Sequence, residues 1–142
     1  MDHKRPESVL IIVYTQARDV LMLRRNDPKD FWQSVTGSLE WGEEPFDAAI
    51  RELQEETGIV HQDVHDCHFF KIFEIYSIWR GRYAPGVTQN REHVFRLQLP
   101  EKVDIQLNPR EHKEFQWLPH EQAVDLAFSH TNQEAILRWV AK

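Results

Sequence analysis

Short apolar runs separated by polar turns fill the first third of the chain. Ser8–Thr15 is continuous, apolar and rich in β-branched residues, which predicts a buried strand. Val20–Arg25 is a second apolar run, and we expect it to form a hairpin with the first. Trp32–Thr36 predicts another short strand, which we expect to stop at Gly37. The N-terminal part of the chain is therefore predicted to form a sheet.

A helical pattern begins at Pro45, a residue well suited to a first helical turn. Apolar residues then recur at the spacing i, i+3, i+4 and i+7, namely Phe46, Ala49, Ile50 and Leu53. Gly58 has the backbone freedom to end a helix in a left-handed conformation. These signals predict a helix over Pro45–Thr57 with one apolar face.

The rest of the chain continues the succession of strands and helices. Apolar runs predict strands over Phe69–Tyr76, His93–Leu99 and Phe115–Leu118, and a helix from Pro119 through Ala127. A capping box of Thr131 and Glu134 is expected to open a last helix. This order of elements predicts an α/β (α+β) fold, in which a mixed central sheet has helices packed against it.

Length and composition narrow the class of protein. The 142 residues fit one domain, residues 1–142, and 41% hydrophobic with 28% charged residues is typical of a globular protein. The single cysteine, Cys67, excludes an intrachain disulfide, and neither a secretory signal nor a membrane-spanning run is visible. The formal net charge of −6 argues against broad binding to nucleic acid or anionic membranes. We therefore expect a cytoplasmic protein, of unspecified oligomeric state.

Three glutamates occupy a second face of the predicted helix, about 120° from the apolar face. Glu52, Glu55 and Glu56 lie one turn apart, and like charges at this spacing destabilise a helix by roughly a few tenths of a kcal/mol per pair. A hard divalent cation would offset that repulsion, since Mg²⁺ prefers oxygen ligands. On their own, however, three glutamates are more typical of a solvated acidic face, with Arg51 as a local counter-charge.

The residues around these glutamates favour the metal-site interpretation. The chain runs Gly37-Ser-Leu-Glu-Trp-Gly-Glu43, then seven residues, then Arg51-Glu-Leu-Gln-Glu-Glu-Thr-Gly-Ile59. Over residues 37–59 this resembles the Nudix box, G-x5-E-x7-R-E-U-x-E-E-x-G-U with U a bulky aliphatic residue, at every fixed position. From average residue usage, a match at one chosen starting point has odds on the order of one in 10⁹. The resemblance is therefore highly specific.

This resemblance implies an α/β/α sandwich with a catalytic loop–helix–loop. It also implies that Mg²⁺, or Mn²⁺ in its place, binds to the carboxylates of Glu52, Glu55 and Glu56. Enzymes of this family hydrolyse a nucleoside diphosphate linked to another group. In that setting Gly37 permits a sharp turn, Glu43 reaches toward the metal or braces the loop, and Arg51 orients a catalytic glutamate. The general base stays open between Glu55, Glu56 and a glutamate outside the box.

Segments outside the box resemble one branch of this family, the bacterial dihydroneopterin triphosphate pyrophosphohydrolases of folate synthesis. They include Lys4-Arg5-Pro6, Phe31–Ser38, Arg82–Thr88 and Glu111-His112. Many Nudix proteins have Pro-Gly-Gly where this chain has Thr36-Gly37-Ser38, and the departure is in the direction of that branch. The resemblance implies attack of water at the α-phosphorus of dihydroneopterin triphosphate, which yields dihydroneopterin monophosphate and pyrophosphate.

The same resemblance gives roles to residues outside the box. Lys4 and Arg25 are expected to meet the triphosphate, and Glu111 to act as an extra metal ligand or base. Aromatic faces suit a flat heterocycle, and the expected pocket residues are Thr36, Phe73, Glu74, Ile75, Tyr76 and Ser129. Each assignment has a plainer alternative, because isolated charges are often surface charges and apolar strand residues are often core residues.

Two other functions would share these motifs. A nucleotide-pool enzyme would use the same chemistry on a nucleoside triphosphate, and a non-catalytic binding module would keep the fold alone. The intact box favours an enzyme, because binding alone does not require all of its acids.

A separate polar cluster comprises His61, Asp63, His65, Asp66, Cys67 and His68. These residue types can bind zinc, but their spacing matches no usual zinc pattern. The default expectation for this segment is therefore a solvated loop.

Overall fold

The computed structural model describes residues 3–27, 31–60 and 63–140. These residues form a seven-stranded mixed sheet. Its strands are β1 (Glu7–Thr15), β2 (Asp19–Arg25), β3 (Trp32–Gln33), β4 (Val35–Ser38), β5 (His65–Glu74), β6 (Gln89–Leu99) and β7 (His112–Pro119). The strand order is β3-β2-β1-β6-β5, with β4 paired to β1 and β7 paired to β2. β1 runs parallel to β6 and antiparallel to β2 and β4.

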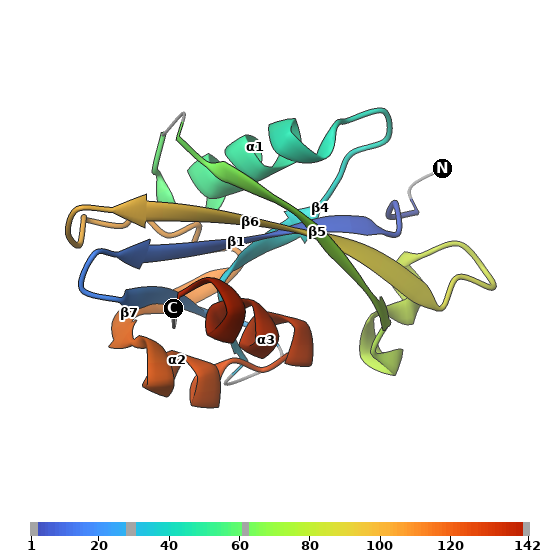
Figure 1. Cartoon of the computed structure of the whole chain (residues 1–142). Coiled ribbons are helices and arrows are strands. Elements are labelled where there is room, and N and C mark those ends of the chain that lie inside the picture. The colour runs from blue at the N-terminus through green and yellow to red at the C-terminus, as the bar shows by residue number, and fades with distance from the viewer. Residues whose placement is uncertain (1–2, 28–30, 61–62, 141–142) are drawn as a thin grey trace.

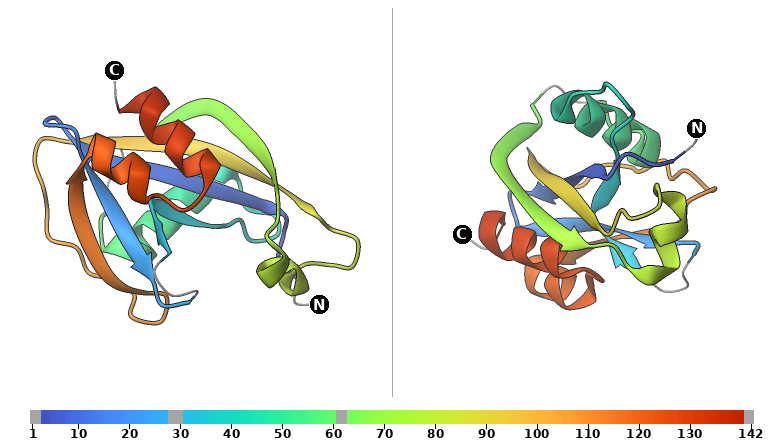
Figure 2. Two further views of the ribbon diagram at one scale, coloured as in Figure 1. Left: turned by 90° about the horizontal axis from the view of Figure 1, so that it is seen from below. Right: turned by 90° about the vertical axis from the view of Figure 1, so that its right-hand side faces the viewer.

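Helices cover both faces of this sheet. They are α1 (Pro45–Thr57), α2 (His120–Leu126) and α3 (His130–Trp139), and a short 3₁₀ helix, η1 (Ser77–Arg82), follows β5. Figure 1 shows α1 on one face and α2 with α3 on the opposite face. The two further views of Figure 2 show the same three layers. The expected α/β/α sandwich is confirmed.

Strict alternation along the central strand β1 creates two cores. Val9, Ile11 and Val13 belong to a buried cluster that includes residues of α1. The intervening Leu10, Ile12 and Tyr14 belong to a second cluster that includes residues of α2 and α3. Side chains of a strand alternate between its faces, so a fully apolar strand needs cover on both sides. The continuous apolar run seen in the sequence therefore marks the middle of the sandwich.

The helix α1 begins and ends where the sequence predicts. Pro45 occupies its first turn, and Gly58 ends it with φ 79°, donating its backbone N–H to the carbonyl of Gln54 at 2.9 Å. The expected apolar face is partly wrong, because Phe46 is 39% exposed. Ala48 is buried with Ala49 and Leu53 instead, and so are two of the glutamates.

Several strand boundaries differ from the sequence expectations. The strand expected over 32–36 is divided at Ser34, and its second part continues through Gly37 to Ser38 because Gly37 pairs with Val9 of β1. The strand expected over 69–76 is β5, which begins earlier and ends at Glu74. Beyond it the chain turns, and the backbone N–H of Ile75 donates to the carbonyl of Thr88.

The expected capping box of the last helix is wrong. Ser129 is the N-cap of α3, and its hydroxyl accepts a hydrogen bond from the backbone N–H of Asn132 at 3.1 Å. Thr131 instead donates its hydroxyl proton to Glu92 of β6 at 2.7 Å. Glu134 lies 3.4 Å from the ammonium group of Lys71 on β5. The Thr131 hydroxyl, which the local pattern assigns to the helix cap, is thus bonded to Glu92 of β6, and Ser129 caps the helix.

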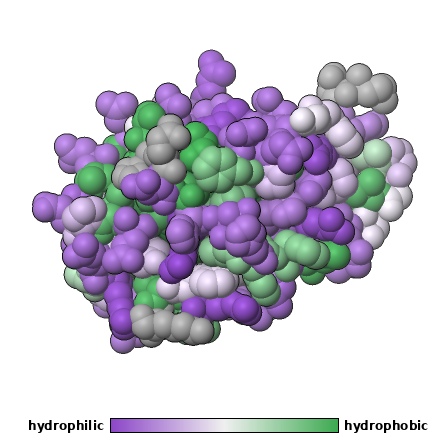
Figure 3. Space-filling model, turned by 45° about the horizontal axis from the view of Figure 1, so that its top comes forward, coloured by the Kyte–Doolittle hydropathy of each residue, from purple (hydrophilic) through white to green (hydrophobic). Residues whose placement is uncertain are grey.

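The surface and the polar cluster of β5 complete the fold. Figure 3 shows a face on which hydrophilic side chains predominate and apolar ones gather in separate patches. Within the described ranges, no helix has the length and apolar character required to cross a membrane. His61 lies outside the described residues, and no three His, Cys, Asp or Glu side chains within them are arranged to hold a metal ion, the polar cluster from Asp63 to His68 included.

Candidate active site

The three box glutamates have different surroundings. Glu52 is 8% exposed and Glu56 1% exposed, whereas the side chain of Glu55 is about half exposed. Burial raises the pKa of Glu52 to about 8 despite the neighbouring guanidinium of Arg51, and burial also raises the pKa of Glu56. A solvated acidic face is therefore the wrong description for two of the three. Buried carboxylates with raised pKa values are instead typical of functional sites.

Gly37 makes room for the carboxylate of Glu52. A Cβ atom at position 37 would overlap the carboxyl group of Glu52, because α1 approaches the backbone of β4 at this point. The expected role of Gly37 was a sharp turn, but the residue lies inside a strand. Its function is close approach rather than a turn.

Arg51 holds the acidic loop and helix together. Its guanidinium donates to both carboxylate oxygens of Glu43, at 2.8 and 2.9 Å, and to the carbonyl of Ser38 at 3.1 Å. It also donates to Glu52 at 3.1 Å and to Glu55 at 3.2 Å. Glu43, which the sequence leaves between metal binding and bracing, here braces the loop through Arg51.

A second acidic pair forms where α1 meets the start of β7. Glu111 hydrogen-bonds with Glu56, and this contact together with burial raises the pKa of Glu111 to about 7. His112 Nδ1 lies 2.8 Å from Glu56 Oε1, but neither atom has an aligned hydrogen-bond partner among the described residues. Burial lowers the pKa of His112 to about 4, so its ring is neutral and cannot neutralise Glu56. One oxygen of Glu56 is thus buried against the His112 ring without an aligned hydrogen bond among the described residues.

Cationic side chains lie beside these acids. Lys4, Arg25 and Arg82 line the same cavity, and burial and the two arginines lower the pKa of Lys4. The backbone holds this arrangement, because the N–H of Lys4 donates to the carbonyl of Arg82 at 2.8 Å. Arg5 then fixes the strand entry by donating to the carbonyls of Glu40 and Glu43, each at 2.9 Å.

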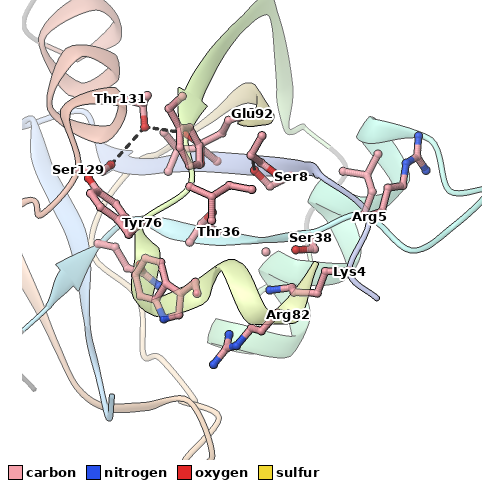
Figure 4. A pocket seen from close by; sticks show the side chains of 18 of the residues that line it. Lys4, Arg5, Ser8, Thr36, Ser38, Tyr76, Arg82, Glu92, Ser129 and Thr131 are labelled. Atoms are coloured by element: carbon pink, nitrogen blue, oxygen red, sulfur yellow. Dashed lines mark hydrogen bonds between the residues drawn. The ribbon is translucent and has the colours of Figure 1, made fainter. Parts of the chain in front are cut away.

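One cavity of about 860 Å³ brings most of the expected site residues together. Its lining includes Lys4, Arg25, Thr36, Arg51, Glu52, Phe73, Glu74, Ile75, Tyr76, Glu111 and Ser129. Glu55 and Glu56 do not line the cavity. Glu56 nevertheless contacts Glu111, and Glu111 lines the cavity. Figure 4 shows Lys4 and Arg82 toward one end of the cavity and Glu92, Ser129 and Thr131 toward the other.

The sequence reasoning missed part of this cavity. Trp79 and Phe128 form an aromatic wall with Tyr76, whose ring centroid lies 5.0 Å from that of Phe128 and 5.6 Å from that of Trp79. Asn90 and Glu92 are buried polar residues of β6 that also line it. The alternation along β6 could have identified this pair, because Asn90 and Glu92 lie at every second position from the buried Val94 and so face the same side of the strand. Nothing local marked Trp79 or Phe128.

The acidic residues fit a hard divalent cation. Carboxylate oxygens are the ligand atoms, Glu56 Oε1 is buried without a hydrogen-bond partner in the described part of the chain, and the Glu52 carboxylate fills the space beside Gly37. No three of these side chains within the described ranges form a ready-made cage. Such an open arrangement suits Mg²⁺, which keeps several waters and shares its ligands with substrate phosphates.

Comparison with known proteins identifies the family. The model of the NUDIX domain matches residues 4–140. The chain belongs to the Nudix family. Its relatives include the dihydroneopterin triphosphate diphosphatase of Escherichia coli K12, 45% identical over 97% of this chain and 94% of the relative. The Haemophilus influenzae protein of the same name is 39% identical over 99% of this chain and 90% of the relative.

A solved structure agrees with the sequence comparison. The structure of the E. coli dihydroneopterin triphosphate pyrophosphohydrolase matches this Nudix chain with a TM-score of 0.93 and 44% identity, and covers 99% of both chains. The expected family and fold are therefore confirmed. Nudix hydrolases use a divalent metal ion, which agrees with the chemistry of the buried carboxylates.

Proposed function

We propose that this Nudix hydrolase converts dihydroneopterin triphosphate to dihydroneopterin monophosphate and pyrophosphate in a Mg²⁺-dependent reaction, with Mn²⁺ as a substitute ion. The observation that carries the proposal is the single cavity that combines buried carboxylates, clustered cations and an aromatic wall. The near full-length likeness to two enzymes named for this reaction supports the same substrate. The reaction belongs to folate synthesis, and we place it in the cytoplasm and in one domain over residues 1–142.

The acidic residues would hold the metal ion. Glu52, Glu55 and Glu56 of α1 and Glu111 before β7 are the proposed ligands. When bound, the ion would neutralise phosphate oxygens and lower the pKa of water near it. We assign Arg51 as a positioning residue, because its guanidinium donates to the proposed metal ligands Glu52 and Glu55. Its bidentate pair with Glu43 fixes the guanidinium in place.

The remaining residues bind the substrate and manage the proton. Lys4, Arg25 and Arg82 would bind the triphosphate, whose charge compensates their mutual repulsion. The oxygen of a water molecule attacks the α-phosphorus, and the bond to the bridging oxygen of the leaving pyrophosphate breaks. The proton of that water passes to the coupled carboxylates of Glu56 and Glu111, which already share a hydrogen bond.

A substrate panel tests the proposal. Purified protein with Mg²⁺ is given dihydroneopterin triphosphate and the common nucleoside triphosphates, and both products are analysed. We expect kcat/KM for the pterin substrate to exceed that for every nucleotide by about tenfold or more, which is about 1.4 kcal/mol of discrimination. Faster hydrolysis of a nucleotide would replace the substrate and keep the mechanism. Absence of any hydrolysis by folded protein would support a binding module.

A further inference from the structure

One carboxylate in the cavity takes no part in the proposed hydrolysis. Glu92 lies on β6, is 6% exposed and lines the cavity. In Figure 4 it lies with Thr131 toward one end of the cavity, whereas Lys4 and Arg82 lie toward the other end. If the cations bind the triphosphate, Glu92 faces the part of the substrate farthest from the phosphates.

The neighbours of Glu92 are neutral hydroxyl groups. Thr131 Oγ1 donates to Glu92 Oε1 at 2.7 Å, and the hydroxyls of Ser8 and Thr36 also lie within hydrogen-bonding reach. Each hydroxyl has one proton, and Thr36 donates its proton to the carbonyl of Val9 at 2.9 Å. Across the described ranges, no Lys, Arg or His forms an ion pair with Glu92.

This end of the cavity therefore has more acceptors than donors. A carboxylate offers about four lone-pair sites, and the hydroxyl protons of Thr131 and Ser8 can fill two of them. Burial without a compensating cation raises the pKa of Glu92 to about 7. Asn90 lies on the same face and donates its Nδ2 to Ser8 Oγ at 2.8 Å, but its buried Oδ1 has no hydrogen-bond partner among the described residues. A ligand with N–H donors would satisfy both groups.

We infer that Glu92 selects the heterocycle by accepting hydrogen bonds from two adjacent donors on one ring edge, a ring N–H and the neighbouring exocyclic amino group. This inference rests on the proposed function and specifies the substrate class of the same site. The 2-amino-4-oxopyrimidine ring of pterins and of guanine presents that pair of donors. Uracil and thymine place a carbonyl beside the ring N–H, adenine has no ring N–H there, and hypoxanthine lacks the amino group.

The geometry of the cavity supports recognition of a ring edge. Tyr76 and Phe128 supply aromatic faces for a flat ring, and such contacts tolerate many heterocycles. A buried carboxylate discriminates more sharply, because bidentate charged pairs are strong and a ligand without the donors leaves the carboxylate unpaired. Glu92 also orients the ring, since the rest of the substrate must then extend toward Lys4 and Arg82.

GTP and ITP provide a matched pair of probes, because they differ only in the 2-amino group. Their inhibition constants are measured against the substrate that the wild-type enzyme hydrolyses fastest. We expect GTP to bind the wild-type enzyme at least about tenfold more tightly than ITP, and the ratio to fall to about twofold or less in Glu92→Gln. The amide can accept only one of the two donors. We also expect kcat/KM for dihydroneopterin triphosphate to fall about 30-fold or more.

Controls separate recognition from general damage. Glu121→Gln makes the same substitution on α2, where the side chain is 79% exposed, and should leave the ratio and the activity unchanged. Because the ratio does not depend on the amount of active enzyme, a loss of stability in Glu92→Gln does not obscure it. Glu92→Asp withdraws the carboxylate from the ring edge and gives a second variant, in which the ratio should also fall.

Several results would overturn the inference. They are equal binding of GTP and ITP by the wild-type enzyme, an unchanged ratio in both Glu92 variants, or equal losses for all substrates including dTTP. The proposed function fails independently, when the wild-type enzyme hydrolyses a nucleotide faster than dihydroneopterin triphosphate. The ratio then retains its meaning, because it is measured against that nucleotide.

Discussion

The backbone of Gly37 and the carboxylate of Glu52 occupy adjoining space that no side chain at position 37 could share. This contact fixes the distance between β4 and α1. Because β4 is also paired with the central strand β1, Glu52 is held at a fixed position relative to the centre of the sheet. The Nudix glycine is thus a spacing residue for a proposed metal ligand.

Gly37→Ala should therefore impair catalysis more than stability. The added methyl group forces the Glu52 carboxylate aside, and a displacement of about 1 Å in an active site can reduce kcat about 100-fold. Steady-state kinetics and thermal melting of the same preparation measure the two effects. Gly81→Ala is the matched control, because a Cβ there meets no atom of residues 3–27, 31–60 or 63–140 within 4 Å. Equal activities of the two variants would contradict the role given to Gly37.

Arg51→Lys should raise the Mg²⁺ concentration required for half-maximal activity. Lysine keeps the charge but cannot form the bidentate pair with Glu43 while also contacting Glu52 and Glu55. We expect about a tenfold higher requirement and a smaller change in KM for the substrate. Activity is titrated with Mg²⁺ for wild type and variant. An unchanged metal requirement would show that Arg51 does not position the ligands.

Glu56→Gln should reduce kcat by about three orders of magnitude while the protein stays folded. The amide removes the charge of a buried carboxylate that contacts both Glu111 and His112. Single-turnover kinetics with Mg²⁺ measure the loss, and circular dichroism checks the fold. The exposed Glu121→Gln serves as the comparison. Near-normal turnover of Glu56→Gln would exclude Glu56 from the metal site.

Cys67→Ser should leave kcat/KM within about twofold of wild type. Burial raises the pKa of Cys67 to about 11, so the group is a thiol rather than a reactive thiolate at neutral pH. The proposed reaction uses water as its nucleophile and has no need of the thiol. Steady-state kinetics of the folded variant measure kcat/KM, and a tenfold or larger loss would contradict a reaction that does not use the thiol.

Stability of the metal-free protein should fall as the pH rises from about 6.5 to 8. The pKa of Glu52 is raised to about 8, and those of Glu111 and Glu92 to about 7, above an ordinary value of 4.5. In this window the folded state binds more protons than the unfolded state, so the free energy of unfolding decreases with pH. Below pH 6.5 the lowered pKa of His112 acts in the opposite direction.

Thermal melting in EDTA and in Mg²⁺ measures this effect. We expect Tm in EDTA to fall by about 5 °C across the window, and Mg²⁺ to raise Tm more at pH 8 than at pH 6.5. The metal binds the ionised carboxylates, so its stabilising effect grows as they lose protons. Glu52→Gln should flatten the pH dependence. A Tm that rises with pH in EDTA would contradict the assignment of these groups.

Local patterns predicted the parts of the fold that local chemistry determines. Pro45 and Gly58 bound α1 because a first-turn proline and a left-handed glycine are local requirements. The continuous apolar run of β1 predicted a buried strand, because Val9 and Leu10 point to opposite faces and both faces must be covered. Spacing alone likewise brought Arg51 next to the helix glutamates.

Contacts between distant segments were beyond the reach of those patterns. Thr131 carries a capping signal, but its hydroxyl bonds to Glu92, 39 residues away in the chain, and the cap passes to Ser129. His112 meets Glu56 only because β7 packs beside α1 at that point. The local sequence around Glu56 or His112 cannot predict this contact, since the burial of both side chains depends on the assembled sheet.

The short strand β4 separates two tasks by one peptide unit. Thr36 is paired with Leu10 and faces the end of the cavity that contains Glu92, whereas Gly37 is paired with Val9 and faces the carboxylate of Glu52. A substitution at Thr36 therefore changes the lining of the cavity without changing the contact between Gly37 and Glu52. A shift of the β1–β4 register by one residue would reverse the two sides together. A substitution within β4 therefore alters one side of the strand, whereas an insertion or deletion there alters both.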